Sequence, residues 1–468
     1  EGWIPISSAK EWIELANIED IPSEAGNNES PSRQQVEWSK KYYLTADLDF
    51  SQLSALDQVK TKSIGNVTNR FMGTIDGNGH KIKGLTLSNS DAGLFWYIGN
   101  TGYVYDLVIE NANVLFSDNA AVIAQSNYGK IENCAVLNCN ITADTGAVLG
   151  GMVSRNFGII RNSYVQGGNL ISNSQTATGH AGFAGANEEG GLIERCWTSM
   201  DVKTMSDYSG GFIGLGYGGT VRDCFALGDV SARSYSGGFV GRSVYEGNKY
   251  ENCYAAGTVT VSGSDGYGFI GGNKPDSAFQ CDQSEGIKNC YYNAESTEDK
   301  NCTGGKKTLD EMRTEGFLSA LNKTGNWKQE VEKNGGLPYL IQVAVPEKPH
   351  TEQMTVEIFL ATYDKNMYQF KKMGDVISIT MASNGNTRVV DVLEAAAEQK
   401  KLTYAYETSP QFGRYIKAIN GYEVTEPDGW MFTINDELSN LSASLAKVKD
   451  GDKILWFEGT TENHFQGP

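Results

Sequence analysis

Three glycines in the stretch GFIGLGYGGTV, namely Gly214, Gly216 and Gly219, have the spacing of a motif that binds dinucleotide phosphates. That motif needs a strand before it, a helix after it and an acidic residue about 20 positions later. The residues that follow, TVRDCFALGDVSA, have apolar side chains at strand spacing and no apolar stripe with a helical period. We therefore expect no nucleotide site here, and no cofactor.

Asp201 and Asp229 are the second possible source of chemistry. If their segments are stacked neighbours, the two carboxylates lie about 5 Å apart, close to the separation in retaining glycosidases. Asn and Asp are also common turn residues, and equivalent positions hold Asn or Thr. We expect a structural role for this pair, with a polysaccharide lyase or glycoside hydrolase as the alternative.

The chain has eight cysteines. Five of them recur at one position of a repeat, where their parallel Cβ directions disfavour disulfides and predict buried free thiols. Cys281 and Cys302 lie outside this position and form the one plausible disulfide. No C-x-x-C motif occurs and the four histidines are scattered, so we predict no metal site. The recurring position reads Cys134, Ser163, Cys196, Cys224, Cys253 and Cys290.

The repeat itself is marked by a pentad of small and apolar residues. Its copies follow each other at steps of 27 to 31 residues without helical patterning, which is typical of a parallel β-helix. We expect a right-handed β-helix of seven coils with a core about 34 Å long, because coils stack at about 4.8 Å. The copies are AGLFW at Ala92, AAVIA at Ala120, GGMVS at Gly150, AGFAG at Ala181, GGFIG at Gly210, GGFVG at Gly237 and YGFIG at Tyr267.

Two further columns flank the cysteine position. The charged column alternates in sign, which predicts ion pairs between neighbouring coils on a solvated face: Glu132, Arg161, Glu194, Arg222, Glu251 and Lys288. The aromatic column follows the cysteines and, if these point inward, faces outward as a platform for sugar rings or a protein: Tyr164, Trp197, Phe225, Tyr254 and Tyr291. The alternative is a packing ladder inside the rod or under a loop.

The repeats resemble the GLUG-motif family, through GGFVG at Gly237–Gly241 and NCYAAGTV at Asn252–Val259. The resemblance covers residues 92–292. It implies a bacterial secreted or surface protein, because such repeats occur there, including in immunoglobulin A peptidases, as accessory rather than catalytic parts.

The flanks of the repeats predict caps and a linker. Residues 1–91 hold a capping helix at SSAKEWIELAN and the opening coils, and residues 293–345 form a cap with a short helical stretch that covers the open end of the rod. Residues 346–353 then form a linker. The last residues, 461–468, resemble the remnant of a protease cleavage site.

Residues 354–460 predict a small α+β domain, β-grasp-like, with a helix at TRVVDVLEAAAEQKK. They resemble the transcobalamin-like C-terminal domain family of unknown function, through Ile419–Gly421, Gly429–Trp430 and Gly451–Asp452 with Trp456. The resemblance implies that a corrinoid-binding surface protein is a further alternative, with Trp430 as a ligand contact. The β-helix departs from the helical partner domain of corrinoid carriers, which favours a core role for Trp430.

The composition of the chain limits the classes of molecule that it is expected to bind. A net charge of −18 disfavours nucleic acid, and no apolar run approaches the length of a membrane span. The chain begins at Glu1 without Met, so we expect a removed leader or a longer parent protein. The prediction is an extracellular or cell-surface, non-catalytic protein whose elongated β-helix serves adhesion by binding a glycan or a host protein.

Overall fold

The computed structural model divides the chain into two compact units. Residues 1–332 and 336–345 form the first, and the remaining residues form the second. The structure describes residues 2–21, 31–89, 93–116, 118–144, 148–176, 179–245, 247–263, 266–272, 286–296, 305–344, 352–364, 369–383, 387–409, 413–424, 429–439, 443 and 446–459.

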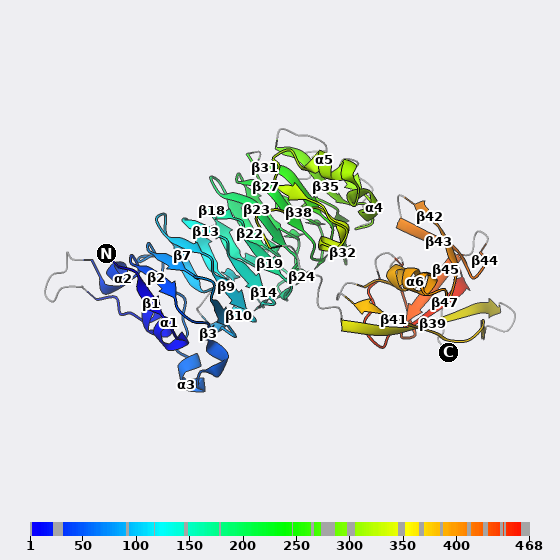
Figure 1. The fold of residues 1–468 in the computed structure, drawn as a ribbon, viewed down its shortest axis with the longest axis horizontal. Coiled ribbons are helices and arrows are strands. Elements are labelled where there is room, and N and C mark those ends of the chain that lie inside the picture. Colours follow the sequence, from blue (N-terminus) through cyan, green and yellow to red (C-terminus); the bar gives the residue numbers. More distant parts are fainter. Residues whose placement is uncertain are drawn as a thin grey trace. The chain divides into compact units, whose positions relative to one another are not determined.

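The first unit is the expected parallel β-helix, in which each strand pairs in parallel with its equivalents one coil before and one coil after (Figure 1). Three of its sheets run along the rod. One is the β7–β34 sheet, made of β7 (Phe95–Ile98), β12 (Ala124–Asn127), β17 (Val153–Asn156), β22 (Ala184–Glu188), β26 (Ile213–Tyr217), β30 (Val240–Ser243) and β34 (Ile270–Gly272). The β6–β32 sheet is made of β6 (Thr86–Asn89), β10 (Asn113–Phe116), β15 (Asn140–Ala143), β20 (Asn169–Ser172), β24 (Asp201–Thr204), β28 (Val230–Ala232) and β32 (Val259–Val261). The β11–β33 sheet is made of β11 (Ala120–Ala121), β16 (Leu149–Gly150), β21 (His180–Ala181), β25 (Ser209–Gly210), β29 (Ser236–Gly237) and β33 (Gly266–Tyr267).

The fourth sheet is a long, bent one that carries the predicted cysteine, charged and aromatic columns. Its first strands are β1 (Ile4–Ile6), β2 (Lys41–Leu44), β3 (Leu48–Asp49), β4 (Thr74–Asp76), β5 (Lys81–Lys83), β8 (Tyr103–Tyr105), β9 (Val108–Glu110), β13 (Lys130–Glu132) and β14 (Ala135–Leu137). Its later strands are β18 (Ile159–Arg161), β19 (Tyr164–Gln166), β23 (Leu192–Thr198), β27 (Thr220–Ala226), β31 (Lys249–Ala255), β35 (Ile287–Asn293) and β36 (Lys306–Lys307).

The bend of this sheet follows from residues in the left-handed backbone region, one in each coil. Their φ values lie between 47° and 55°, a conformation that Asn and Asp adopt more easily than other side chains with a Cβ. Arg195 is the exception among them. The series is Asp106, Asn133, Asn162, Arg195, Asp223, Asn252 and Asn289.

The pentads form part of the core of the rod. Their phenylalanines Phe183, Phe212, Phe239 and Phe269 stack with ring centroids 4.6, 4.8 and 4.9 Å apart. The neighbouring glycines are needed because a Cβ would collide with the next coil: one on Gly211 would strike the carbonyl oxygen of Gly238. These residues therefore serve close packing of coils.

Two glycines of GFIGLGYGG have the same explanation. A Cβ on Gly216 would collide with the hydroxyl of Tyr250, and one on Gly219 would collide with the side chain of Asn187. Neither glycine has a positive φ, so both are required for close approach between coils, whereas Gly218 has a φ of 96° and serves the conformation of the backbone. β26 is followed by β27, a strand, and not by the helix that a phosphate site needs.

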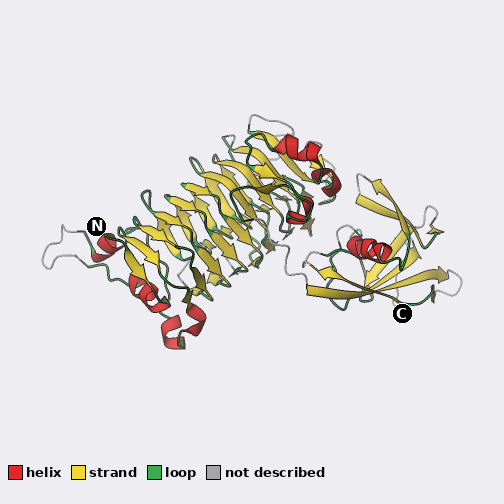
Figure 2. Ribbon diagram, in the orientation of Figure 1, coloured by secondary structure: helices red, strands yellow, loops and turns green. Residues whose placement is uncertain are grey.

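The N-terminal cap contains α1 (Ala9–Ala16), α2 (Arg33–Glu37), the 3₁₀ turn at Phe50–Gln52 and α3 (Ala55–Gln58), drawn as helices in Figure 2. Ser8 begins α1 by accepting a hydrogen bond from the backbone N–H of Glu11. The indole of Trp12 is fully buried and meets Phe95 edge to face at 6.1 Å. The predicted capping helix is thus present and is packed on the first coils.

The C-terminal cap contains α4 (Leu309–Met312), α5 (Glu315–Leu321) and the short antiparallel pair β37 (Trp327–Lys328) and β38 (Tyr339–Leu340). The helical stretch was predicted, but the surface of the rod on which it packs was not. The expectation that this segment covers the open end of the rod is incomplete, because its apolar side chains pack along the aromatic column of the long bent sheet.

The second unit has a sheet around one long strand, β39 (Glu352–Asp364), which pairs in parallel with β47 (Lys453–Gly459) and in antiparallel with β41 (Ile377–Ser383) and β40 (Gln369–Lys372). β45 (Gly429–Ile434) and β46 (Glu437–Leu438) extend it beyond β47. Helix α6 (Val389–Glu398) contributes its apolar face to the core. A second sheet contains β42 (Tyr404–Ser409), β43 (Gly413–Ile419) and β44 (Tyr422–Glu423). This is the small α+β unit that was predicted.

Candidate functional site

The possible catalytic pair, Asp201 and Asp229, belongs to a ladder of side-chain to backbone hydrogen bonds. A carboxylate oxygen of Asp201 accepts from the backbone N–H of Asp229 at 3.0 Å. Asp229 accepts in turn from the backbone N–H of Thr258 at 2.7 Å, and Asn140 does the same for Asn169 at 3.1 Å. Asn and Asp side chains thus accept equivalent backbone hydrogen bonds along this column, which is the structural role expected of turn residues.

The aromatic column is stacked as predicted but does not face solvent. Ring centroids of Tyr164 and Trp197 are 4.8 Å apart, those of Trp197 and Phe225 are 5.7 Å apart, and those of Phe225 and Tyr254 are 5.1 Å apart. Trp197, Phe225 and Tyr254 are 0% exposed, whereas Tyr164 and Tyr291 are partly exposed.

The cap covers this column, which corrects the prediction of an exposed platform. Met312, Phe317, Leu321 and Trp327 pack against the stacked rings in one apolar cluster. The alternative interpretation, a packing ladder under a covering segment, is the one that the structure supports. Trp197, Phe225 and Tyr254 therefore have no surface on which a ligand could lie.

Polar groups fix the cap to the column. The indole N–H of Trp197 donates to the carbonyl oxygen of Ala344 at 2.9 Å, and the hydroxyl of Tyr254 donates to the carbonyl oxygen of Pro338 at 2.6 Å. The buried carboxylate of Asp223 accepts from the side chains of Thr324 at 2.8 Å, Asn326 at 2.8 Å and Trp327 at 3.1 Å. A buried carboxylate with several donors is a strong anchor, because each of these hydrogen bonds is charge-assisted.

Among the described residues, three of the five ion pairs that the alternation of the charged column predicts are present: Arg161–Glu194, Glu194–Arg222 and Glu251–Lys288. Glu194 lies on the strand between Arg161 and Arg222 and pairs with both, and also with its neighbour Arg195. Its side chain is only 3% exposed. Burial alone would raise the pKa of this carboxyl, but the hydrogen bond from Arg222 and the charges of the three guanidiniums outweigh burial and hold the pKa below its ordinary value.

The cysteine column is buried inside the rod. All six cysteines that the structure describes are buried and free, and they include Cys139, which lies outside the column and which the repeat alignment overlooked. Burial raises the pKa of Cys134 to about 12 and that of Cys139 to about 11, so both are protonated and unreactive at neutral pH. Cys281 and Cys302 lie outside the described residues, so their disulfide stays a prediction.

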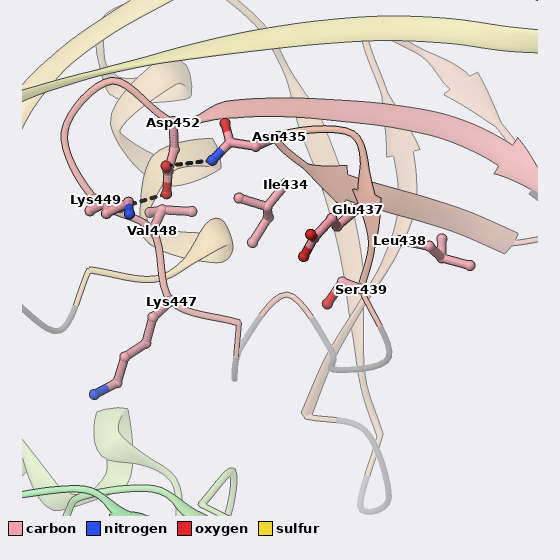
Figure 3. A pocket seen from close by; sticks show the side chains of 9 residues that line it. All are labelled: Ile434, Asn435, Glu437, Leu438, Ser439, Lys447, Val448, Lys449 and Asp452. Atoms are coloured by element: carbon pink, nitrogen blue, oxygen red, sulfur yellow. Dashed lines mark hydrogen bonds between the residues drawn. The ribbon is translucent and has the colours of Figure 1, made fainter. Parts of the chain in front are cut away.

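In the second unit, Trp430 is 8% exposed and belongs to the apolar core, beside Phe432 and Trp456. The prediction that its ring contacts a ligand therefore has no support from the structure. A hollow of about 560 Å³ lies at the other end of β45, between β45–β46 and the segment before β47, and Trp430 does not line it (Figure 3). Its Asp452 accepts from the side chain of Asn435 at 2.8 Å and from the backbone N–H of Lys449 at 2.9 Å, which is a structural role.

The outer surface of the β7–β34 sheet carries an array of side chains that was not predicted, all partly exposed except Glu188, which is buried. We call it the aromatic–arginine face, and its residues come from the sheet or from the turns beside it. Tyr128 and Phe157 stack with centroids 4.4 Å apart and an interplanar angle of 4°. Its residues are Arg70, Tyr97, Tyr128, Arg155, Phe157, Glu188, Tyr208, Tyr217 and Arg242.

Guanidinium groups lie over the rings of this face at both ends. The Cζ atom of Arg70 is 4.2 Å from the ring centroid of Tyr128 and 5.6 Å from that of Tyr97. The Cζ atom of Arg242 is 4.6 Å from the ring centroid of Tyr208. Stacking of this kind is attractive and leaves the terminal NH₂ groups in the guanidinium plane for a further partner, whereas Nε of Arg242 is itself buried.

The middle of the face is electrically neutral. Arg155 lies 5.9 Å from the ring centroid of Phe157 and 6.0 Å from that of Tyr217, and its guanidinium pairs with Glu188 at 2.5 Å. Burial raises the pKa of the Glu188 carboxyl, and the attraction of Arg155 offsets only part of this rise.

A sequence signal for this face existed. An aromatic residue directly before a glycine recurs in Tyr128–Gly129, Phe157–Gly158 and Tyr217–Gly218. The first two dipeptides are 29 residues apart and the last two are 60 apart, so alignment by coil brings them to one position. Arg70 precedes the repeats, and only the structure places it beside Tyr128.

Family comparison adds one domain assignment. Residues 386–457 match a domain family of unknown function, DUF4430. This match confirms, for these residues, the resemblance of the C-terminal unit to the transcobalamin-like family. The GLUG-motif resemblance of the repeats stays a prediction.

Two relatives share short segments with the chain. Halomucin of Haloquadratum walsbyi is 37% identical over 91 residues, which cover 19% of this chain and 1% of halomucin. A candidate Gly-rich membrane protein of Evansella cellulosilytica is 31% identical over 101 residues, which cover 20% of this chain and 12% of that protein. The chain therefore corresponds to a small part of either relative.

Among solved structures, a candidate immunoglobulin A1 protease from Bacteroides ovatus aligns with a TM-score of 0.47 and 18% identity. The alignment covers 73% of this chain and 92% of that one.

Within the described part of the chain, no three or more His, Cys, Asp or Glu side chains are grouped so that they could hold a metal ion. No helix among the same residues combines the length and apolar character needed to cross a membrane.

Proposed function

We propose that the chain is a non-catalytic binding module of a secreted or cell-surface bacterial protein, and that its β-helix holds an extracellular polymer along the aromatic–arginine face. The observation that carries this proposal is the face itself. It places partly exposed rings and guanidiniums on or beside the strands of one sheet, where an extended ligand can contact several coils at once.

The location at the cell surface rests on weaker support. A net charge of −18 suits a soluble extracellular protein, and one relative is named as a membrane protein. The short shared segments agree with a module that is carried by longer proteins.

A glycan array probed with the whole chain tests the proposal. We expect binding to at least one polysaccharide and about fivefold weaker binding for Tyr128→Ala, since the substitution removes both a hydroxyl and the ring that supports Arg70, a combined loss of about 1 kcal/mol. The matched control is Ile171→Ala, which trims an exposed apolar side chain on β20 of the β6–β32 sheet. An array without any bound polysaccharide, or equal losses in both variants, would contradict the proposal.

A further inference from the structure

The charge of the aromatic–arginine face indicates the chemical class of its polymer. Resting on the function proposed above, we infer that the face holds a carboxylate-bearing glycan, such as a polyuronate, and that Arg70 and Arg242 receive its carboxylates.

The arginines of the rod differ in whether they have carboxylate partners. Among the residues that the structure describes, neither Arg70 nor Arg242 forms an ion pair with Asp or Glu, although each stacks on a tyrosine ring. Five other arginines of the coils do have such partners: Arg155, Arg161, Arg195, Arg222 and Arg233.

This difference is informative because the chain is acidic. With 57 acidic and 39 basic residues, carboxylates are abundant, yet none described pairs with these two guanidiniums. A guanidinium has a planar fork of N–H donors that matches a carboxylate, and a ring beneath it fixes the orientation of that fork. Each of the two arginines is therefore prepared to bind a carboxylate from another molecule.

The separation of the two arginines requires an extended ligand. Tyr97, under Arg70, lies on β7, and Arg242 lies on β30, five strands further along the same sheet. At about 4.8 Å per strand this is about 24 Å, which a single small anion does not span. A polymer with carboxylates at intervals can reach both positions, whereas the Arg155–Glu188 pair between them adds no net charge.

Hydroxyl-rich sugars suit the surface between the arginines better than a peptide does. Because Tyr128 and Phe157 stack face to face, their faces are covered and mainly their edges point outward. The phenol groups of Tyr97 and Tyr128 make no hydrogen bond within the described residues, so they are available as donors and acceptors. Protein interfaces depend instead on apolar anchors buried in pockets.

Titration calorimetry of the whole chain with polygalacturonate and with its fully methyl-esterified form tests the inference, because the ester keeps the backbone and removes the charge. We expect tighter binding of the acid form, because its carboxylates can pair with the two guanidiniums at short range, although the net charge of −18 opposes the approach of any polyanion. Arg70→Gln and Arg242→Gln should each weaken that binding about threefold to fivefold, the range of an exposed ion pair, and leave the ester unaffected. Lys203→Gln, which removes one charge from the β6–β32 sheet, is the control and should change neither.

Other outcomes overturn the inference in distinguishable ways. Equal binding of acid and ester, or binding of neutral glycans alone, refutes the role of the carboxylates but leaves a polymer-binding module. Tighter binding of dextran sulfate identifies a sulfated glycan instead, and equal binding of polyglutamate identifies an acidic peptide. An equal loss of affinity in Lys203→Gln would mean that the net charge of the chain, and not the position of the two arginines, determines binding. Absence of binding to every polymer refutes the proposed function as well. The comparison of acid with ester needs no variant, so it holds even if a variant fails to fold.

Discussion

Replacing Asp223 with Asn should release the C-terminal cap from the rod. Asp223 is 2% exposed and its carboxylate accepts four side-chain hydrogen bonds, from Thr324, Asn326, Trp327 and Asn252. Asn suits the left-handed backbone at this position, where φ is 51°, as it does in four other coils. The substitution therefore changes the charge and the acceptors while it keeps the shape of the bend.

The magnitude follows from the lost acceptors. A hydrogen bond to a charged group contributes about 1.5–3 kcal/mol, whereas a neutral one contributes about 1 kcal/mol. The amide of Asn keeps one oxygen, but its NH₂ group would face the NH₂ group of Asn326 or the N–H of Trp327. Thr324 is exposed and can bind water instead, so we expect a net loss of about 2 kcal/mol, confined to the cap.

Hydrogen–deuterium exchange of the amides in α5 and β37 measures this loss directly. A loss of about 2 kcal/mol speeds exchange through local opening about 30-fold, while amides of β12 and β17 keep their protection, because each coil depends mainly on its neighbours. Asp106→Asn is the matched control, since Asp106 has the same left-handed backbone but is exposed. Unchanged protection of the cap in Asp223→Asn, or an equal loss in the control, would refute the anchoring role of the carboxylate.

Two further predictions concern buried titratable groups. Because the pKa of Glu194 is held below its ordinary value of 4.5, its stabilisation is present at neutral pH and is lost as the pH falls below about 4.5. In urea unfolding at pH 7, Glu194→Gln should be less stable than wild type by about 2 kcal/mol. At about pH 3.5 this difference in the free energy of unfolding should be smaller. The same difference at both pH values would argue against a stabilising role of the ionised carboxylate. Cys134 and Cys139 should resist alkylation in the native protein and react in urea, as counted by peptide mass spectrometry, and labelling of either without denaturant would contradict their burial.

Much of the rod could be predicted from the sequence because stacked coils place equivalent residues above one another. The column of Cys196 and Cys224 and the alternation around Glu194 follow from that geometry alone, since period and strand alternation determine which side chains are neighbours. The fold class and the stacking of Trp197 on Phe225 were predictable for the same reason.

What lies on top of a column could not be predicted in this way. Trp327 packs on Phe225 although it lies about a hundred residues further along the chain and has no period that relates it to that ring. Arg70 reaches Tyr128 from a turn that precedes the repeats, so the alignment that defines the columns omits it. In both cases the sequence did not predict a contact between a repeated segment and a segment outside the repeats. Such contacts determine which aromatic residues of the rod are exposed.

The alternating charges of the long bent sheet also constrain how such a rod can change length. From Glu132 to Lys288 the sign reverses at every coil, so the pattern repeats every second coil. Duplication or deletion of two coils within this series keeps every acidic residue beside a basic one. A change of a single coil places two like charges on adjacent strands, which is destabilising. Homologous rods that preserve the alternation should therefore differ in length by even numbers of coils.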